Sequence, residues 1–556
     1  MNGFDESAQT MSLMAFIAVA TVTLLLCVMT GPDRDDLDEF YTGFRSLSPV
    51  RNGLAIAGDY LSAATVLGTT GVIALTGHDG LVLALSTALS LVLLMFLLAE
   101  PLRNAGRFTM GDVLTRRSPG RAVRIAACAV TLAALVPLMV VQLAGSGSLL
   151  AFILGFDSSG FRTGSIVVLG VVMIGYAAIG GMKGTALIQI VKTVVLLGAG
   201  LLVSVLIMNR FDWDTGALLR AAQQGSGAGA AYLHSGLQFG GNDLDMISSE
   251  LTVVLGAACL PHITMRMSSV RSAQAVRRSL SWAVCVVVCL CLLLTVIGFG
   301  AAALVGHNRI TAAGAQGNSA ILQVSGAVAG GGEVGALVVT TMTTAIFLTL
   351  LASVAGMILA CANSLAHDLF AHGLHGLRDR SREPVPGRIE MGAAQLAAVG
   401  VGLTAIVLAV LARHWNVQAM VTLSFCIGAS ALAPALVYSM FWRRFTRTGL
   451  LCTLIGGTLC VLVLMTGTNL VSGSPGAVFP DLDVNWFPFT TTGLVSIPFG
   501  FLAGWLGTVL GRRTAAEERR QYEAVEPWIL AGAPPVTSAR PAHEDRAAPG
   551  RSRNPF

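Results

Sequence analysis

The residues of this sequence that could do chemistry are polar side chains that stand alone inside long apolar runs. Asp59 is the one formal charge in the run GLAIAGDYLSAATVLGTTG, which begins at Gly53. A carboxylate at membrane depth costs about 2.5 to 3.5 kcal/mol on insertion scales, so a functional role is the default interpretation. We expect Asp59 to act beside a cation or in proton handling, because an ionised carboxylate would repel an anionic substrate. A structural role as the cap of a broken helix is the alternative.

Four further polar residues could line an ion or substrate path. Thr349 and Ser353 lie four residues apart, on one face of a helix. Their hydroxyls could bind a cation, although small hydroxyl residues also pack between membrane helices. His262 follows Pro261, and it either lines the substrate path or is satisfied by freed backbone carbonyls. Gln142 either faces the path or bonds a neighbouring helix.

The sequence lacks the constellations that mark an enzyme or a metal centre. All ten cysteines lie within apolar runs, and none forms a CxxC or a Cys/His spacing that suits zinc. The glycine-rich stretch QQGSGAGA follows no predicted strand and precedes no GKS or GKT, so it does not predict a phosphate loop. The sequence has neither a nucleophile elbow nor a cluster of intramembrane carboxylates. We therefore expect no catalytic residues and no cofactor.

The composition identifies the elements that must position these residues as membrane spans. Of the 556 residues, 54% are hydrophobic and 12% are charged, and the mean hydropathy is +0.73. Soluble globular proteins carry about 25% charged residues. We therefore expect an all-α polytopic protein in the lipid bilayer, and we expect neither a cytosolic enzyme nor a nucleic-acid-binding protein.

Apolar windows of about 20 residues, the length that spans a bilayer, recur along the chain. Thirteen such windows lie near 11–30, 53–76, 80–100, 124–150, 163–181, 186–208, 248–265, 280–305, 334–365, 391–412, 416–440, 449–467 and 489–511. Asp5 and Glu6 precede the first window and no basic residue does, so this window is expected to remain as a span and not to be a signal peptide.

The basic residues predict the orientation of these spans. If the N-terminus is outside, the external intervals contain only five of the 35 Lys and Arg residues. These five are Arg162, Arg210, Arg220, Arg309 and Arg413. The positive-inside rule then predicts an external N-terminus and a cytoplasmic C-terminus. Arg103, Arg107 and Arg124 are interpreted as topology determinants at the cytoplasmic face and not as anion ligands.

Two of the predicted spans contain residues that interrupt helices. The second span has four glycines around Asp59, and the seventh has Gly256 and Pro261. Backbone groups freed at membrane depth must face protein or a water-filled cavity. The two interrupted spans are five apart, in corresponding positions of two five-span halves, which is typical of inverted-repeat secondary transporters.

This pattern divides the chain into six parts. They are an N-terminal extra span (1–30), a first repeat with spans 2 to 6 (31–208), an external loop (209–247), a second repeat with spans 7 to 11 (248–440), spans 12 and 13 (441–511) and a cytoplasmic tail (512–556). The tail is rich in Arg, Glu, Pro and Ala, and we expect it to be disordered. It is too short for a catalytic domain.

Six stretches of the sequence carry a family resemblance. They are EFYTGFRSLSPVRNGLAIAGDYLSAATVLG from Glu39, GHDGL from Gly77, AEPLRNAGRFTMGDVLTRR from Ala99, IGGMKGTALIQIVK from Ile179, LPHITMR from Leu260 and ANSLAHDLF from Ala362. Through these stretches the chain resembles the sodium:solute symporters, and within them the cation/acetate (monocarboxylate) branch. The resemblance implies a leucine-transporter-type 5+5 inverted repeat, with one extra N-terminal helix and two extra C-terminal helices.

The resemblance also implies a sodium ion between the break in the second span and the ninth span. The ligands that it implies are the carbonyls of Gly58 and Leu61 together with Thr349, Ala352 and Ser353. Sodium is a hard cation that prefers oxygen ligands, so backbone carbonyls and hydroxyls suit it. Sugar-transporting relatives have two adjacent hydroxyls where this chain has Ala352 and Ser353, so one hydroxyl is missing or is supplied by Thr349.

The function that we expect is a secondary symporter of the cytoplasmic membrane, which imports acetate or a similar short-chain monocarboxylate with sodium by alternating access. The helix halves around Ala63 to Thr65 and Gly256 to His262 are expected to present N–H groups to the carboxylate, near Asp59 and Ser62. Alternatives are a sodium- or proton-coupled symporter of a sugar, an amino acid or a larger organic acid, and a transporter-like sensor.

Overall fold

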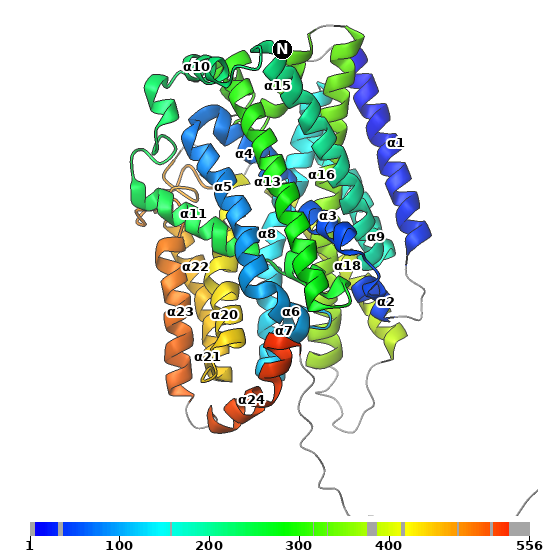
Figure 1. The fold of residues 1–556 in the computed structure, drawn as a ribbon, viewed down its shortest axis with the longest axis vertical. Helices are drawn as coiled ribbons and strands as arrows, with labels where there is room; N and C mark the ends of the chain where they lie inside the picture. The colour runs from blue at the N-terminus through cyan, green and yellow to red at the C-terminus, as the bar shows by residue number, and fades with distance from the viewer. Residues whose placement is uncertain are drawn as a thin grey trace, which may run out of the picture.

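The structure is a bundle of helices, most of which run along the longest axis of the molecule (Figure 1). It is a computed structural model that describes residues 6–31, 37–155, 158–314, 316–330, 332–374, 386–412, 417–474, 477–511 and 515–532. Within these residues no strand forms, and one isolated bridge joins Ser472 to Phe479. The all-α prediction is therefore confirmed.

Helical segments account for most of the described chain. In chain order they are α1 Glu6–Thr30, α2 Leu37–Thr42, η1 Gly43–Arg45, α3 Pro49–Tyr60, α4 Ala63–Thr76, α5 His78–Leu93, η2 Leu94–Leu98, α6 Ala99–Ala105, α7 Met110–Arg117, α8 Arg121–Leu154, α9 Ser159–Arg210, α10 Thr215–Gly225, η3 Gly229–Leu233, α11 Asp243–Ala258, α12 Pro261–Thr264, η4 Met265–Ser269, α13 Ala273–Leu304, α14 His307–Ala312, α15 Ala320–Ala329, α16 Glu333–Asn363, η5 Ser364–Leu374, α18 Gly387–Leu411, α19 Val417–Ile427, η6 Gly428–Leu432, α20 Ala433–Phe441, α21 Arg447–Leu451, η7 Cys452–Gly456, α22 Gly457–Thr466, α23 Gly493–Leu510 and α24 Ala515–Ala531.

The spans can be counted from these segments. In the described chain, 11 helical segments are long and apolar enough to cross a membrane. One of them, α9, has 52 residues and contains Gly181, whose φ of 52° and ψ of −157° lie outside the helical range. Glycine adopts this conformation readily because it has no Cβ, and two helices meet there. Counting α9 as two spans and the short pair α3 and α4 as one gives the thirteen spans that the sequence predicts.

The second span is broken where the sequence predicts an interruption. α3 ends at Tyr60, Leu61 has φ −82° and ψ 81°, and α4 begins at Ala63. Ser62 is the N-cap residue of α4, and its hydroxyl accepts the N–H of Thr65 at 3.2 Å. The break therefore creates a new helix start inside the bundle.

The seventh span is broken at Cys259 and Leu260, between α11 and α12. Pro261 begins α12, a position where its missing N–H has no helical partner to lose. Gly256, the other residue predicted to weaken this span, lies in the last turn of α11, just before the break. A Cβ at this position would come within 2.2 Å of the carbonyl oxygen of Phe425, so Gly256 permits close packing of α11 on α19.

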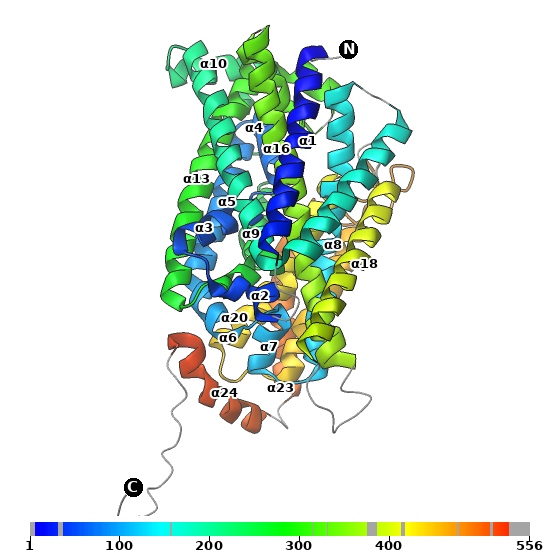
Figure 2. The ribbon, with the colours of Figure 1, turned by 90° about the vertical axis from the view of Figure 1, so that its right-hand side faces the viewer.

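α16 is the central helix of the bundle. The apolar window of its span is 100% buried, whereas that of α1 is 11% buried. α16 packs against α9, α1, α18, α8 and α15. Figures 1 and 2 both show α1 along the outside of the bundle, which agrees with its interpretation as an extra helix.

The segment after the last span includes a helix. α24 packs on α6, α7 and α20, at the end of the bundle opposite α10 (Figures 1 and 2). Two aromatic side chains attach it: Tyr522 donates to the carbonyl of Met440 at 2.5 Å, and Trp528 Nε1 donates to that of Asn104 at 2.9 Å. The prediction of a disordered tail is therefore wrong for 515–531, because aromatic anchors offset its polar composition. Residues 512–514 and 533–556 of that tail lie outside the described residues.

Arg117 fixes α24 from the side of α7. Its guanidinium lies 3.9 Å from the centre of the Tyr522 ring and donates to the carbonyls of Arg443 at 2.8 Å and Phe445 at 2.5 Å. Burial lowers the pKa of Arg117 to about 10, so the side chain remains charged at neutral pH. The charge can therefore stabilise carbonyls of the turn between α20 and α21.

Candidate functional site

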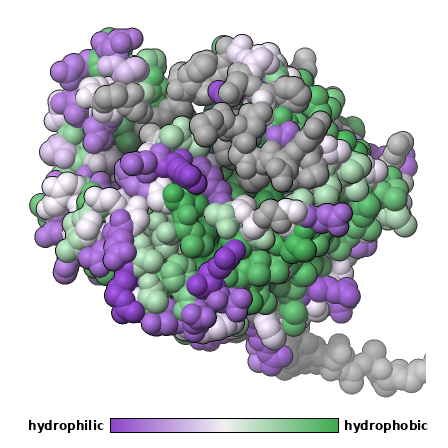
Figure 3. All heavy atoms as spheres, turned by 90° about the horizontal axis from the view of Figure 1, so that it is seen from above, coloured by the Kyte–Doolittle hydropathy of each residue, from purple (hydrophilic) through white to green (hydrophobic). Residues whose placement is uncertain are grey.

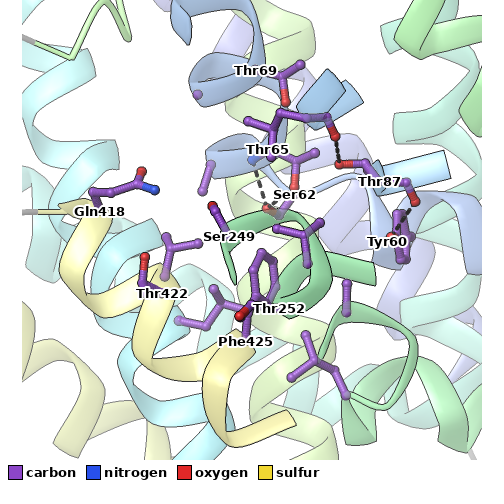
Figure 4. A pocket seen from close by; sticks show the side chains of 18 of the residues that line it. Tyr60, Ser62, Thr65, Thr69, Thr87, Ser249, Thr252, Gln418, Thr422 and Phe425 are labelled. Atoms are coloured by element: carbon purple, nitrogen blue, oxygen red, sulfur yellow. Dashed lines mark hydrogen bonds between the residues drawn. The ribbon is translucent and has the colours of Figure 1, made fainter. Parts of the chain in front are cut away.

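A cavity of about 100 Å³ lies beside the break between α3 and α4. Its walls come from α3, α4, α5, α8, α11, α12, α16 and α19, and from the segments before α11 and α23. Figure 4 shows Ser62 and Thr65 from the break on one side, and Gln418, Thr422 and Phe425 from α19 on the other. The broken span therefore faces a space that could hold a small solute.

Hydroxyl groups make up much of the polar lining of this cavity. They belong to Tyr60, Ser62, Thr65, Thr69, Thr87, Ser249, Thr252, Thr422 and Thr491. Among the described residues that line it, Asp59 and Glu250 are the only carboxylates, and none is a Lys or an Arg. The cavity can therefore offer many hydrogen bonds and few charges.

The start of α4 faces the cavity. Its first N–H groups, those of Ala63 and Ala64, have no helical carbonyl four residues earlier within α4. The helix dipole adds partial positive charge at this end, which favours an anion. Ser62, Ala64 and Thr65 line the cavity, while the side chain of Ala63 is buried beside it.

The second predicted helix start contributes less positive potential to the cavity. α12 has four residues and continues into the η4 turn, so its dipole is small. His262 on α12 lines the cavity, and its Nδ1 is buried without a hydrogen-bond partner among the described residues. Gln142 on α8 is buried with both amide atoms unpaired among those residues, and it is not part of the lining. The structure therefore brings His262 to the cavity and leaves Gln142 apart from it.

Asp59 is buried in a network that joins the two broken spans. Its carboxylate forms an ion pair with Arg266 of η4, and both side chains are at most 2% exposed. Gln189 of α9 donates to the other oxygen of Asp59 at 2.6 Å. Arg266 also donates to the carbonyl of Met182 at 3.1 Å and to the hydroxyl of Thr185 at 3.3 Å. The negative charge of Asp59 is thus compensated within the protein.

Lys192 of α9 lies between α3 and α16. Its Nζ donates to the carbonyl of Gly58 at 2.5 Å and to the hydroxyl of Ser353 at 2.9 Å, and the side chain is fully buried. Gly58 permits this approach, because a Cβ there would lie 2.6 Å from the carbonyl oxygen of Gln189. Two of the oxygens predicted to bind sodium are therefore bonded to an ammonium group of the chain itself.

The other predicted sodium ligands are also placed by the structure. Thr349 donates its hydroxyl to the carbonyl of Ala345 at 2.6 Å, one turn earlier in α16. The carbonyl of Ala352 accepts from Gln189 Nε2 at 2.9 Å. Leu61 lies in the break itself and is 1% exposed. The five predicted ligands thus come from the two elements expected, but most of their oxygens have protein partners.

A second polar cluster lies where α7, α8, η5 and α18 meet. Asp112 accepts from Arg124 at 2.9 Å and lies 3.1 Å from His367 Nε2, and the other ring nitrogen of His367 lies 2.6 Å from Glu390. Burial would raise the pKa of Asp112, but His367 and Arg124 hold it well below its usual range. Arg124 also donates to Asp368 at 3.1 Å. The prediction that Arg124 only sets the topology is therefore incomplete, because this arginine also joins α8 to α7 and η5.

Sequence patterns alone do not identify three residues of the network around Asp59. They are Arg266, Gln189 and Lys192. Arg266 and Lys192 stand close to predicted span ends, where the positive-inside rule accounts for basic residues without a further role. A signal was present for Gln189 and Lys192. They are three residues apart within an apolar run, so they share one face of the helix.

Comparison with known proteins shows which family the chain matches. Residues 40–457 match the model of the sodium:solute symporter family. A monocarboxylic acid transporter of Corynebacterium glutamicum is 36% identical over 516 residues, which cover 90% of this chain and 92% of the relative. An uncharacterised symporter of Bacillus subtilis, YwcA, is 34% identical over 508 residues, which cover 91% and 96%.

A solved structure shows a similar fold. It is that of a substrate-bound, outward-open, Na+-coupled sialic acid symporter, with a TM-score of 0.68 and 14% sequence identity over 90% of this chain and 97% of that one. The family match spans most of the chain and includes the broken α3–α4 span and the central helix α16. This chain is a member of the sodium:solute symporter family.

Proposed function

We propose that this protein is a secondary symporter that imports acetate or a similar short-chain monocarboxylate by alternating access. The observation that carries the proposal is the hydroxyl-rich cavity at the start of α4, where the carboxylate of Asp59 is neutralised by Arg266. The relative from Corynebacterium glutamicum, which is named a monocarboxylic acid transporter, supports the substrate class.

The carboxylate of the substrate would bind at the start of α4. The donors nearest to the break are the N–H groups of Ala63 and Ala64 and one hydroxyl of the pair Ser62 and Thr65, which are bonded to each other at 3.0 Å. A hydrogen bond to a charged group contributes about 1.5–3 kcal/mol, and a partly buried helix end up to about 2 kcal/mol. Two or three such contacts offset part of the cost of association and supply the main favourable contribution to binding.

The rest of the cavity suits a short apolar group. Val72, Leu138, Val253 and Phe425 contribute apolar surface opposite the donors. Donors on one side and apolar side chains on the other suit a carboxylate with a short apolar group better than a sugar, whose hydroxyls would face the apolar side. This is why we place short monocarboxylates before the amino acid, sugar and larger organic acid alternatives.

The proposal also concerns the ion whose gradient drives transport. The family description and the sodium-coupled structural neighbour suggest sodium. The predicted ligands do not fit a sodium ion in this structure, because Lys192 already bonds to Gly58 and Ser353. We therefore propose coupling to a cation gradient and derive no step through a sodium ion at this site. Coupling requires only that the cation and the substrate favour the same conformation.

The orientation that we propose follows the basic residues. An external N-terminus and a cytoplasmic C-terminus would place α24 at the cytoplasmic face and α10 outside, in the cytoplasmic membrane. The end that carries α10 shows many hydrophilic residues on its surface, as expected for a face in water (Figure 3).

Uptake into proteoliposomes tests the proposal. Purified protein is reconstituted, and uptake of labelled acetate and labelled pyruvate is measured under an inward sodium gradient and, separately, under an inward proton gradient. Pyruvate is included because acetic acid crosses bilayers unaided. Accumulation under either gradient that excess propionate inhibits would support the proposal. Uptake no greater than in protein-free liposomes under both gradients would refute the substrate class.

A further inference from the structure

The site between α3 and α16 already contains the amino group of a lysine. Lys192 Nζ lies 2.5 Å from the carbonyl oxygen of Gly58 and 2.9 Å from Ser353 Oγ. An ammonium group has three N–H donors and no acceptor, so it satisfies oxygen ligands much as a small metal cation does. One predicted sodium ligand on each side of the site, Gly58 on α3 and Ser353 on α16, is thus bound by the same side chain.

The remaining predicted ligands offer a metal ion fewer oxygens beside the lysine. Thr349 donates its hydroxyl proton to the carbonyl of Ala345 within α16, and Ala352 has no hydroxyl. The carbonyl of Ala352 is bonded to Gln189 Nε2. A hard cation needs several oxygen ligands, and a metal ion placed here would also meet the repulsion of the nearby ammonium group.

One face of α9 holds the site together. Gln189 and Lys192 are three residues apart, and each joins α3 to α16. Gln189 bonds Asp59 and the carbonyl of Ala352, while Lys192 bonds Gly58 and Ser353. This is the connection that the resemblance assigns to the bound ion.

The charge of Lys192 in its protonated form can be compared with that of a sodium ion. Asp59 is the carboxylate nearest in the network, and Arg266 pairs with it directly. The charges of Asp59 and Arg266 cancel, so a protonated Lys192 leaves one net positive charge among these three residues, as a sodium ion would. His262 lies on α12, beyond the pair, and Gln189 separates Asp59 from Ala352 as a neutral donor.

We propose that Lys192 is a built-in cation that takes the place of sodium between α3 and α16, and that this site binds no sodium ion. The inference rests on the proposed function only for its consequence for transport. It follows that the link between α3 and α16 does not depend on the sodium concentration, and that any sodium-driven step must use other residues.

Sodium-dependent thermal stability of the purified full chain tests the inference without any substrate. The melting temperature Tm is measured in detergent with sodium chloride and with choline chloride at equal ionic strength. The variants are the wild type, Ser353→Ala, Lys192→Ala and the double variant Lys192→Ala with Ser353→Ala. The readout is the part of the sodium-induced rise in Tm that Ser353→Ala removes, so a sodium site elsewhere cancels from the comparison.

We expect no such Ser353-dependent rise in the wild type. Lys192→Ala vacates the site while leaving Gly58 and Ser353 in place, and its Tm should rise with sodium in a manner that Ser353→Ala abolishes. A Ser353-dependent rise in the wild type would overturn the inference, because sodium would then bind despite the lysine. The inference also fails if Lys192→Ala is folded and responds no more than the wild type. If Lys192→Ala does not fold, the comparison of wild type with Ser353→Ala still decides whether this site binds sodium. Because no substrate is present, failure here would leave the proposed monocarboxylate transport untouched.

Discussion

The buried pair between Asp59 and Arg266 gives the sharpest prediction about stability. Arg266→Met keeps an unbranched apolar stem but removes the ion pair and the bonds to Met182 and Thr185. Asp59 would then be buried with Gln189 as its remaining partner. Removing one member of a buried ion pair costs about 3–5 kcal/mol, because the other charge is left uncompensated. Since whole proteins are stable by about 5–15 kcal/mol, we expect a large fall in Tm.

The matched controls are Asp59→Asn and the double variant Asp59→Asn with Arg266→Met. Asp59→Asn leaves the Arg266 charge buried and should destabilise the protein by a similar amount. The double variant removes both charges and should be more stable than the sum of the two single changes predicts. The assay is thermal unfolding in detergent for all four proteins, as a double-mutant cycle. Additivity of the two effects to within about 0.5 kcal/mol would refute the reasoning, because residues in contact should couple.

The same variants separate structure from transport. Because Asp59 lines the cavity, we expect Asp59→Asn to lower uptake more than it lowers membrane insertion. Insertion is measured as the amount of folded protein in the membrane fraction. Normal uptake by Asp59→Asn would show that its carboxylate is only structural.

Three further changes have expected effects of different sizes. Gly58→Ala should destabilise the protein by about 1–3 kcal/mol, because its Cβ would lie 2.6 Å from a backbone oxygen of α9. The control, Gly68→Ala, should be tolerated because its Cβ would have no atom within 4 Å. Equal melting temperatures for the two variants would contradict this prediction. Ser62→Ala should destabilise the protein by about 1 kcal/mol, because the N-cap of α4 is lost. It should also raise the KM for the carboxylate substrate. An unchanged KM would remove Ser62 from the binding site. Tyr522→Phe should cost about 0.5–1.5 kcal/mol of stability and release α24, because it removes the bond to Met440. Limited proteolysis would detect the release as faster cleavage. Unchanged cleavage would show that the bond to Met440 does not hold this helix.

Much of the fold could be predicted from the sequence because hydropathy and helix breakers act locally. The break at Leu61 follows from glycines around Asp59, and the kink at Gly181 marks where two predicted spans meet. The close packing of Gly256 on Phe425 could not be predicted, because the partner lies far away in the chain. α24 was missed because its anchors, Tyr522 and Trp528, bind partners far away in the chain.

The candidate site could be predicted only in part. The sequence places Asp59 at membrane depth but does not show its partner, because Arg266 is 207 residues away and resembles a basic residue at a span end. Lys192 was missed for the same reason, although its contacts with Gly58 and Ser353 change the chemistry of the predicted cation site. Side chains that meet across the bundle are therefore the part that local patterns do not specify.

The central claim is that the protein carries monocarboxylates by alternating access, and counterflow tests it most directly. Proteoliposomes are loaded with unlabelled pyruvate and diluted into a trace of labelled pyruvate, with the same sodium concentration and pH on both sides. A carrier with one alternating site predicts transient accumulation of label above the external level, which excess acetate or propionate should suppress. Label that never exceeds the external level, with protein shown to be folded and inserted, would contradict the account.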